Sequence, residues 1–137
     1  MQNKKNGIIV AIGGGEMGRT KIFTDGHIKK YPIETAEIDK TLIQLSNKKC
    51  PRLIFLGTAT KDAQSYINTV KDYFKKYYNC SVSALKLTEK NLTYAEIQKV
   101  IEKADLIYVG GGDTRYMINL GKRKRVIPLL RKAYNRG

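Results

Sequence analysis

The sequence predicts an α/β domain in which helices cover both faces of a mainly parallel β-sheet. Three short apolar runs, at residues 8–12, 53–56 and 106–109, are continuous, do not alternate with polar residues, and are each followed by glycine. Runs of this kind are typical of strands buried on both faces of a sheet. Helical periods separate them, and parallel neighbours need crossover connections, which are nearly always right-handed. This alternation of strands and helices is therefore typical of a flavodoxin-like or Rossmann-like three-layer sandwich.

The first strand, residues 8–12, is followed by a long stretch without a helical or strand-like period, from residue 14 to residue 33. Asp25-Gly26 and Pro32 interrupt any helix there. Connections of this length in a compact domain are usually functional lids or mobile segments. We expect this stretch to be irregular.

Three helices are predicted from apolar residues that recur on one face. The third begins with a capping box, in which the Thr93 hydroxyl and the Glu96 carboxylate satisfy amides at the helix start. A fourth strand candidate, residues 81–87, mixes polar and apolar positions and is expected near an edge of the sheet. The apolar faces consist of Ile38, Leu42 and Leu45 in the first helix, Ile67, Val70 and Phe74 in the second, and Ile97, Val100, Ile101 and Ala104 in the third.

The last predicted element is a helix over residues 127–134, and Gly137 is placed where a glycine ends a helix. A strand should come next in this alternation. We therefore expect residues 1–137 to form a single domain whose sheet is incomplete at the C-terminus. An unfinished parallel edge exposes unpaired backbone groups, so self-association, or pairing with a partner segment, is expected.

A formal net charge of +14 is the strongest signal in the composition, because such a charge attracts polyanions. The 26 lysines and arginines are nevertheless scattered as pairs, whereas a nucleic-acid footprint should gather on one face. A solvated basic surface is the favoured interpretation, and a nucleic-acid partner the less favoured one. The single dense run consists of Lys122, Arg123, Lys124 and Arg125.

No apolar run approaches the roughly 18 residues that cross a bilayer, and the first residues lack the pattern of a signal peptide. We expect a cytoplasmic protein without a membrane partner. Cys50 and Cys80 form no Cys-x-x-Cys pair, and the only histidine, His27, leaves no ligand set for zinc. No Gly-x-Ser-x-Gly turn occurs, so the chain holds no complete hydrolytic triad. No metal or cofactor is expected.

Three glycine-containing loops follow the apolar strands, at residues 13–16, 57–60 and 110–114. In open α/β sheets, ligands bind beyond the carboxyl ends of the strands, where these loops should converge. Successive glycines let backbone N–H groups approach an anion or a developing oxyanion closely. Tight turns beneath a packed helix are the plainer explanation for one such loop, but two triple-glycine loops at the same edge favour a binding site.

The first loop also comes close to two nucleotide motifs. Gly13-x-Gly15-x-x-Gly18 matches the dinucleotide fingerprint, and the same stretch resembles a P-loop with Arg19 where lysine is required. Both motifs must lie at the start of a helix, but the residues from Arg19 to Pro32 disfavour a helix because they contain Asp25-Gly26 and Pro32. We regard each as a chance match.

These motifs together resemble the peptidase E and cyanophycinase family of serine peptidases. The combination of two spaced glycine motifs with an apolar-Gly-Thr-Ala-Thr strand end is more specific than either glycine run alone. The resemblance runs from Gly7 to the end of the chain. It is carried by residues 8–16, by Ile33-Glu34-Thr35 with Glu37-Ile38-Asp39-Lys40, and by residues 53–60 and 107–114.

The resemblance implies a flavodoxin-like fold and a metal-free serine hydrolase that cleaves small aspartyl peptides through an acyl-enzyme. It further implies that this chain supplies the oxyanion side of the crevice, whereas the serine and the histidine belong to later sequence. No catalytic residue is therefore expected in this chain. The implied oxyanion candidates are Gly111, Gly112 and Asp113, and the substrate-lining candidates are Gly14, Gly15, Glu16, Thr58, Thr60 and Thr114.

Two departures from the family pattern affect these expectations. The family usually has asparagine where Asp113 stands, and a carboxylate facing an oxyanion would repel it. Asp113 is therefore expected to cap the next helix, with only its N–H group useful in the site. The chain also stops before the nucleophile strand, so we expect it to be inactive alone. The alternative is a non-catalytic α/β module that binds anions, nucleotides or RNA.

Overall fold

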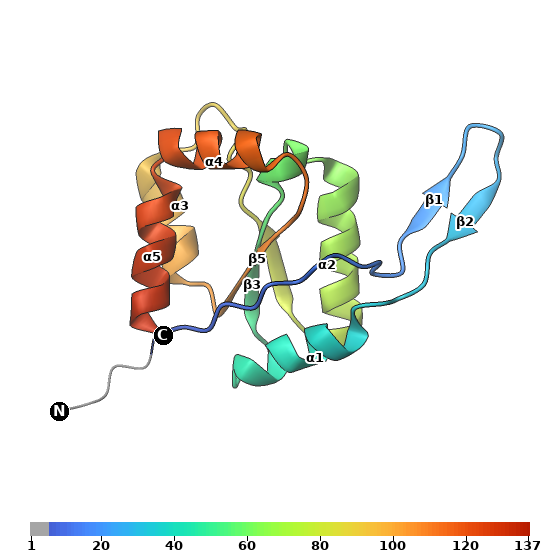
Figure 1. Cartoon of the computed structure of the whole chain (residues 1–137), viewed down its shortest axis with the longest axis horizontal. Helices are drawn as coiled ribbons and strands as arrows, with labels where there is room; N and C mark the ends of the chain where they lie inside the picture. Colours follow the sequence, from blue (N-terminus) through green and yellow to red (C-terminus); the bar gives the residue numbers. More distant parts are fainter. Residues whose placement is uncertain (1–5) are drawn as a thin grey trace.

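The computed structural model describes residues 6–137 and has a three-stranded parallel sheet at its centre (Figure 1). The middle strand, β3 (Arg52–Leu56), pairs with β4 (Ser81–Ala84) on one side and with β5 (Leu106–Val109) on the other. The fold class predicted from the sequence is confirmed. The edge position expected for the strand at residue 81 is also confirmed.

Helices cover both faces of this sheet. α2 (Gln64–Tyr78) packs on one face, and α3 (Tyr94–Glu102) and α5 (Val126–Arg136) pack on the other. α4 (Thr114–Arg123) lies across the top of the sheet in Figure 1, beside the short helix η1 (Thr58–Thr60), and joins the layer of α3 and α5. The result is the three-layer arrangement that the alternation predicted.

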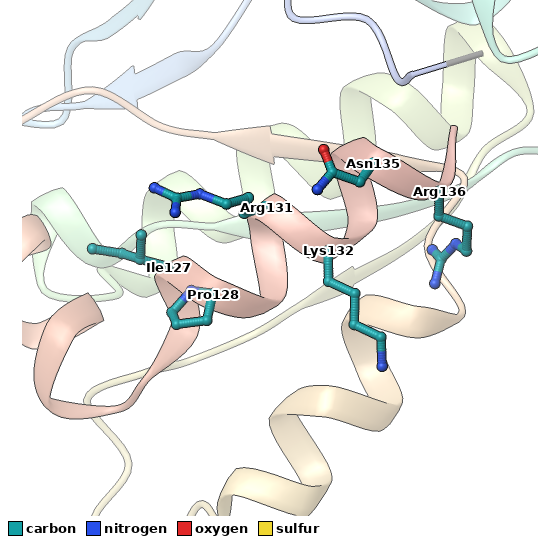
Figure 2. Close-up of a pocket in the computed structure, with 6 residues that line it drawn as sticks. All are labelled: Ile127, Pro128, Arg131, Lys132, Asn135 and Arg136. Carbon is teal, nitrogen blue, oxygen red and sulfur yellow. The ribbon is translucent and has the colours of Figure 1, made fainter. Parts of the chain in front are cut away.

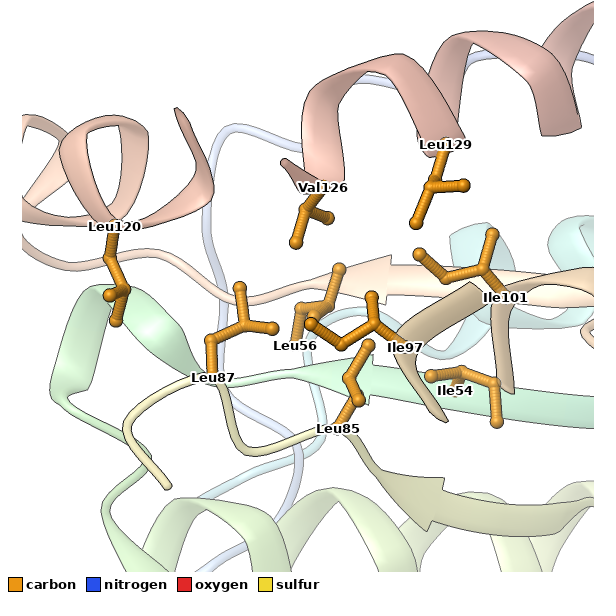
Figure 3. Close-up of a cluster of buried hydrophobic side chains, with 9 residues drawn as sticks. All are labelled: Ile54, Leu56, Leu85, Leu87, Ile97, Ile101, Leu120, Val126 and Leu129. Atoms are coloured by element: carbon orange, nitrogen blue, oxygen red, sulfur yellow. The ribbon is translucent and has the colours of Figure 1, made fainter. Parts of the chain in front are cut away.

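The apolar run of β3 fills both layers because successive side chains point to opposite faces of a strand. Leu53 and Phe55 pack with the buried face of α2. Ile54 and Leu56 point the other way, into a cluster with residues of α3, α4 and α5, which Figure 3 shows converging on the sheet. The members of that cluster are Ile54, Leu56, Leu85, Leu87, Ile97, Ile101, Leu120, Val126 and Leu129.

The predicted capping box at the start of α3 is confirmed. The N–H group of Glu96 donates to the Thr93 hydroxyl oxygen at 3.3 Å, and the N–H group of Thr93 donates to the Glu96 carboxylate at 2.8 Å. The pattern of Thr, Glu and the apolar residues after them therefore located this helix start correctly.

The predicted first strand is wrong in this structure. Residues 8–12 make no strand ladder, and Ile8 and Ile9 are 66% and 79% exposed. The segment is fastened at its two ends, by a hydrogen bond from the Gly7 N–H group to the Tyr134 carbonyl and by an isolated bridge between Met17 and Ile33. An apolar run becomes a buried strand only where a neighbouring strand offers hydrogen bonds and a helix covers it, and these residues have neither.

α1 (Ala36–Leu45) forms as predicted, but its predicted apolar face is not buried. Ile38 and Leu45 are 40% and 46% exposed, whereas Asp39 on another face is fully buried. Asp39 accepts a hydrogen bond of 2.6 Å from the Thr35 hydroxyl, which offsets part of the cost of burying a carboxylate. The helix is therefore anchored by polar contacts as well as by packing.

The stretch expected to be irregular contains a β-hairpin. β1 (Thr20–Ile22) and β2 (Ile28–Lys30) pair antiparallel, and Figure 1 shows them extending away from the sheet and helices. The turn is closed by a hydrogen bond from the Phe23 N–H group to the His27 carbonyl and by one from the Gly26 N–H group to the Phe23 carbonyl. Asp25-Gly26 thus makes a hairpin turn there.

Within residues 6–137, no helix combines the length and the apolar composition needed to cross a membrane.

Candidate functional site

The second and third glycine loops are joined to one another by backbone hydrogen bonds. The Gly110 N–H group donates to the Leu56 carbonyl at 3.0 Å, and the Asp113 N–H group donates to the Ala59 carbonyl at 2.8 Å. Gly112 lies so close to this carbonyl that an added Cβ would stand 2.6 Å from the Ala59 oxygen, and its φ of +144° also favours glycine. The sequence therefore needs glycine here to bring the ends of β3 and β5 together.

Asp113 caps α4, as expected. Its Oδ1 atom accepts a hydrogen bond of 2.9 Å from the Tyr116 N–H group. Its own N–H group, which was expected to face the ligand, is used by the Ala59 carbonyl. Of the three oxyanion candidates, only Gly111 lines the groove described below, and its backbone amide lies against the Tyr66 hydroxyl.

The three threonine candidates lie in different environments. Thr58 is 1% exposed, and its hydroxyl oxygen has no hydrogen-bond partner among the described residues. Thr60 is half-buried and donates to the Gly57 carbonyl at 2.9 Å, and Thr114 is exposed at the start of α4. Only Thr60 lies on the wall of the groove described below.

The first glycine loop is held against the segment that precedes α1. The Glu16 N–H group donates to the Glu34 carboxylate at 2.9 Å, and the Glu34 N–H group donates to the Glu16 carbonyl at 2.7 Å. Arg19 makes two hydrogen bonds of 2.9 Å to the Glu16 carboxylate. An added Cβ on Gly15 would lie 2.7 Å from Thr35 Cγ2, so this loop passes close over the start of the helix.

One open groove of about 1910 Å³ brings the loops together. It runs along β5 and the unpaired N-terminal segment, and it reaches the ends of β3 and β5. Five of the nine candidate residues line it: Gly14, Gly15, Glu16, Thr60 and Gly111. Thr58, Gly112, Asp113 and Thr114 do not line it.

Tyr66 of α2 also lines this groove, and nothing in the sequence singled it out. Its ring packs edge-on against Phe55, with 5.0 Å between ring centroids. Burial raises the pKa of Tyr66, and a hydrogen bond with the Gly111 backbone lowers it by less. The hydroxyl therefore stays protonated at neutral pH beside the third loop. In the sequence, Tyr66 is simply a polar-aromatic position of an amphipathic helix.

The groove offers amides, hydroxyls and carboxylates but no pair of nucleophile and base. Among the described residues that line it there is no histidine and no cysteine. Cys50 is exposed and Cys80 is buried, and burial raises the pKa of the Cys80 thiol to about 11. The described part of the chain holds no cluster of three metal-ligating side chains. The arrangement can bind and polarise a ligand, but it holds no residues that would attack it.

A second hollow, of about 660 Å³, lies on the outer side of α5 and contains no candidate site residue. Figure 2 shows its side chains along the helix surface. One of its cations, Lys132, lies 3.6 Å from the Glu102 carboxylate. The residues around it are Ile127, Pro128, Arg131, Lys132, Asn135 and Arg136.

Comparison with known proteins gives three matches. The family model described as peptidase family S51 matches residues 23–137. The uncharacterized peptidase YgaJ of Bacillus subtilis (strain 168) is 29% identical over 129 residues, which cover 94% of this chain and 50% of the relative. The chain thus spans about half the length of that curated relative.

A crystal structure of a Listeria monocytogenes EGD-e protein, described as a peptidase E, superimposes with a TM-score of 0.55 at 22% identity. The match covers 66% of this chain and 45% of the other. At this identity the likeness establishes the fold alone.

Proposed function

Because the chain belongs to peptidase family S51, we propose that it forms the glycine-loop half of a serine-peptidase active site. In this proposal the backbone amide of Gly111, which lines the groove, binds the oxyanion of an acyl-transfer reaction. The first loop, at Gly14 and Gly15, lines the substrate side of the same groove. The preferred substrates are small aspartyl peptides.

The observation that carries the proposal is the common groove. Its walls include the first glycine loop, Thr60 after β3 and Gly111 after β5. Ligands bind at this edge in open α/β sheets, and fixed amides there stabilise negative charge without having to reorganise. Tyr66 adds a protonated hydroxyl next to Gly111.

The printed sequence contains no Gly-x-Ser-x-Gly turn, and no histidine lines the groove among the described residues. We infer that the nucleophile and its base come from sequence outside these 137 residues. The chain by itself should therefore not hydrolyse an aspartyl dipeptide, because covalent catalysis supplies most of the rate enhancement in such enzymes.

The test is reconstitution. The pure chain is mixed with the half of the Bacillus subtilis relative that the match leaves uncovered, and release of the amino-terminal aspartate from a dipeptide is measured. Hydrolysis is expected from the mixture and not from either part. Gly111→Pro, which removes the amide N–H, should lower kcat by roughly 10²-fold.

Gly111→Ala is the matched control, because it keeps the amide and its Cβ would have no neighbour within 4 Å. This variant should stay close to the unmodified mixture. Turnover by the 137-residue chain alone would overturn the assignment of the nucleophile, and equal losses in both Gly111 variants would overturn the role of its amide.

A further inference from the structure

The hairpin of β1 and β2 carries an ordered surface that extends beyond the proposed hydrolase site, although Arg19 and Lys21 also line the groove. Side chains alternate between the two faces of a strand, and the register pairs Lys21 with Lys29. The alternation puts six residues on one face of this two-stranded ribbon. They are Arg19, Lys21, Phe23, His27, Lys29 and Tyr31.

Cations and aromatic rings alternate along this face. The Arg19 guanidinium lies 4.3 Å from the centre of the Tyr31 ring, and the Lys29 ammonium group lies 4.8 Å from the same centre. On the other strand, the Lys21 ammonium group lies 4.8 Å from the Phe23 ring. Phe23 in turn stacks on His27, with 4.5 Å between centroids and 4° between planes.

The middle of the face holds positive charge that no described acidic side chain compensates. Arg19 is paired with Glu16, and His27 lies 3.7 Å from an Asp25 oxygen at the turn. Lys21 and Lys29 make no salt bridge within residues 6–137, although they stand directly opposite one another. Like charges at paired strand positions disfavour the strand pair, so anions bound to these lysines would offset that cost.

We propose that this face of the hairpin binds single-stranded nucleic acid, with phosphates bound by the Lys21 and Lys29 ammonium groups. Bases stack on Phe23 and Tyr31 in place of the side chains that now lie against those rings. Interleaved cations and rings match a ligand that alternates anionic groups with flat aromatic ones, and base stacking on aromatic side chains is tolerant of sequence. An acidic peptide would use the lysines but has no bases to stack. A duplex keeps the faces of its bases covered.

The position of the hairpin supports this partner. It extends from the body of the molecule, where a strand of nucleic acid can reach it without meeting a helix (Figure 1). The net charge of +14 would steer a polyanion towards the protein from a distance. The scattered lysines gave no reason to favour nucleic acid over a solvated surface, but the hairpin gathers some of them on one face with aromatic rings.

The experiment measures binding of a short, fluorescently labelled single-stranded RNA to the pure chain by anisotropy, across a series of salt concentrations. The double variant Lys21→Ala/Lys29→Ala should weaken binding about tenfold or more. It should also reduce the magnitude of the slope of log binding constant against log salt concentration by about 1 to 2, because fewer counterions are released. Lys21→Arg/Lys29→Arg should restore both quantities.

Lys71→Ala/Lys75→Ala is the matched control, since it removes two exposed lysines from α2 and gives the same net charge. It should leave the salt slope nearly unchanged. Phe23→Leu/Tyr31→Leu should weaken binding roughly tenfold with the salt slope preserved, because stacking releases no counterions. Circular dichroism checks that each variant keeps the fold.

Three outcomes would overturn the proposal. Equal losses in the two alanine pairs would assign binding to the overall charge. Tighter binding of a duplex of the same sequence would point to groove recognition. If polyglutamate bound as tightly as the RNA, and Phe23→Leu/Tyr31→Leu left that affinity unchanged, the partner would be an acidic protein.

Discussion

Gly111 and Gly112 are neighbours in sequence but serve different purposes in the structure. Gly112 has a positive φ and approaches the Ala59 carbonyl, so it holds the loops at β3 and β5 together. Gly111 faces the groove with open space around it. A run of three glycines in the sequence does not reveal this division, because it depends on which backbone lies opposite each residue.

The two glycines should therefore respond differently to alanine. Gly112→Ala should lower the free energy of unfolding by roughly 1–3 kcal/mol, through backbone strain and the clash with Ala59. Gly111→Ala should be close to neutral or slightly stabilising. Urea unfolding of both variants measures the difference, and equal stabilities would show that Gly112 is not constrained as described.

The site itself was only partly predictable at the level of residues. Gly111 follows β5 and lines the groove, because the carboxyl ends of parallel strands share an edge. Gly14 and Gly15 line the same groove although the segment before them forms no strand, so the predicted strand order does not explain their position. The burial of Thr58 and the contribution of Tyr66 depend on the packing of η1 and α2. No local pattern carries that information.

At the scale of elements, the start of β3 is tied to the start of β5 by one carboxylate. Asp105 accepts hydrogen bonds from the Arg52 N–H group at 2.8 Å and from the Arg52 guanidinium at 3.1 Å and 3.2 Å. These hydrogen bonds, led by the one from the Arg52 side chain, lower the pKa of Asp105. The Asp105 side chain is 13% exposed, so solvent only partly screens the pair.

This pair should make stability depend on pH in the acid range. A carboxyl whose pKa is lower in the folded state stabilises the protein above its unfolded pKa, which is about 3.9, and loses that contribution as pH falls through the folded pKa. Asp105→Asn should cost about 1 kcal/mol at neutral pH. Its difference from the unmodified chain should shrink below about pH 4.

Urea unfolding across a pH series measures this difference. Asp72→Asn, which alters an exposed carboxylate of α2 with no described ion pair, should show no such trend. A constant difference between Asp105→Asn and the unmodified chain at all pH values would contradict the electrostatic explanation.

Elements were predictable where local pattern and tertiary contacts agree. The runs at 53–56 and 106–109 became paired strands, and α2 and α3 bury the faces expected of them. The run at 8–12 is similarly apolar, but a strand also needs a hydrogen-bonded partner strand, which an apolar composition does not supply. The hairpin differs from the irregular stretch expected there, although Asp25-Gly26 between two short segments is a hairpin signal.

At the scale of the whole molecule, the sheet ends in two outer strands, β4 and β5. Within residues 6–137, β5 has β3 as its single strand partner, and Val109 at its end is 46% exposed. The apolar side chains of Ile8 and Ile9, which form no strand, line the groove that runs along β5. Exposed edges and apolar surface of this kind promote pairing with another chain.

The pure chain should consequently self-associate as its concentration rises. Light scattering should show the average mass increasing, and Ile9→Lys/Val109→Lys should suppress the increase by placing charge on the edge. Tyr77→Lys, at a 51% exposed position on α2, should leave it unchanged. A constant monomer mass for the unmodified chain would show that this edge does not pair.

The central strand has a further consequence for how the molecule loses its structure. Leu53 and Phe55 belong to one apolar layer, and Ile54 and Leu56 belong to the other. Since a single five-residue strand contributes to both, we expect the two layers to unfold together. Heating should thus produce one cooperative transition, with near-ultraviolet tyrosine signals from the α2 side and helix content overall disappearing at the same temperature.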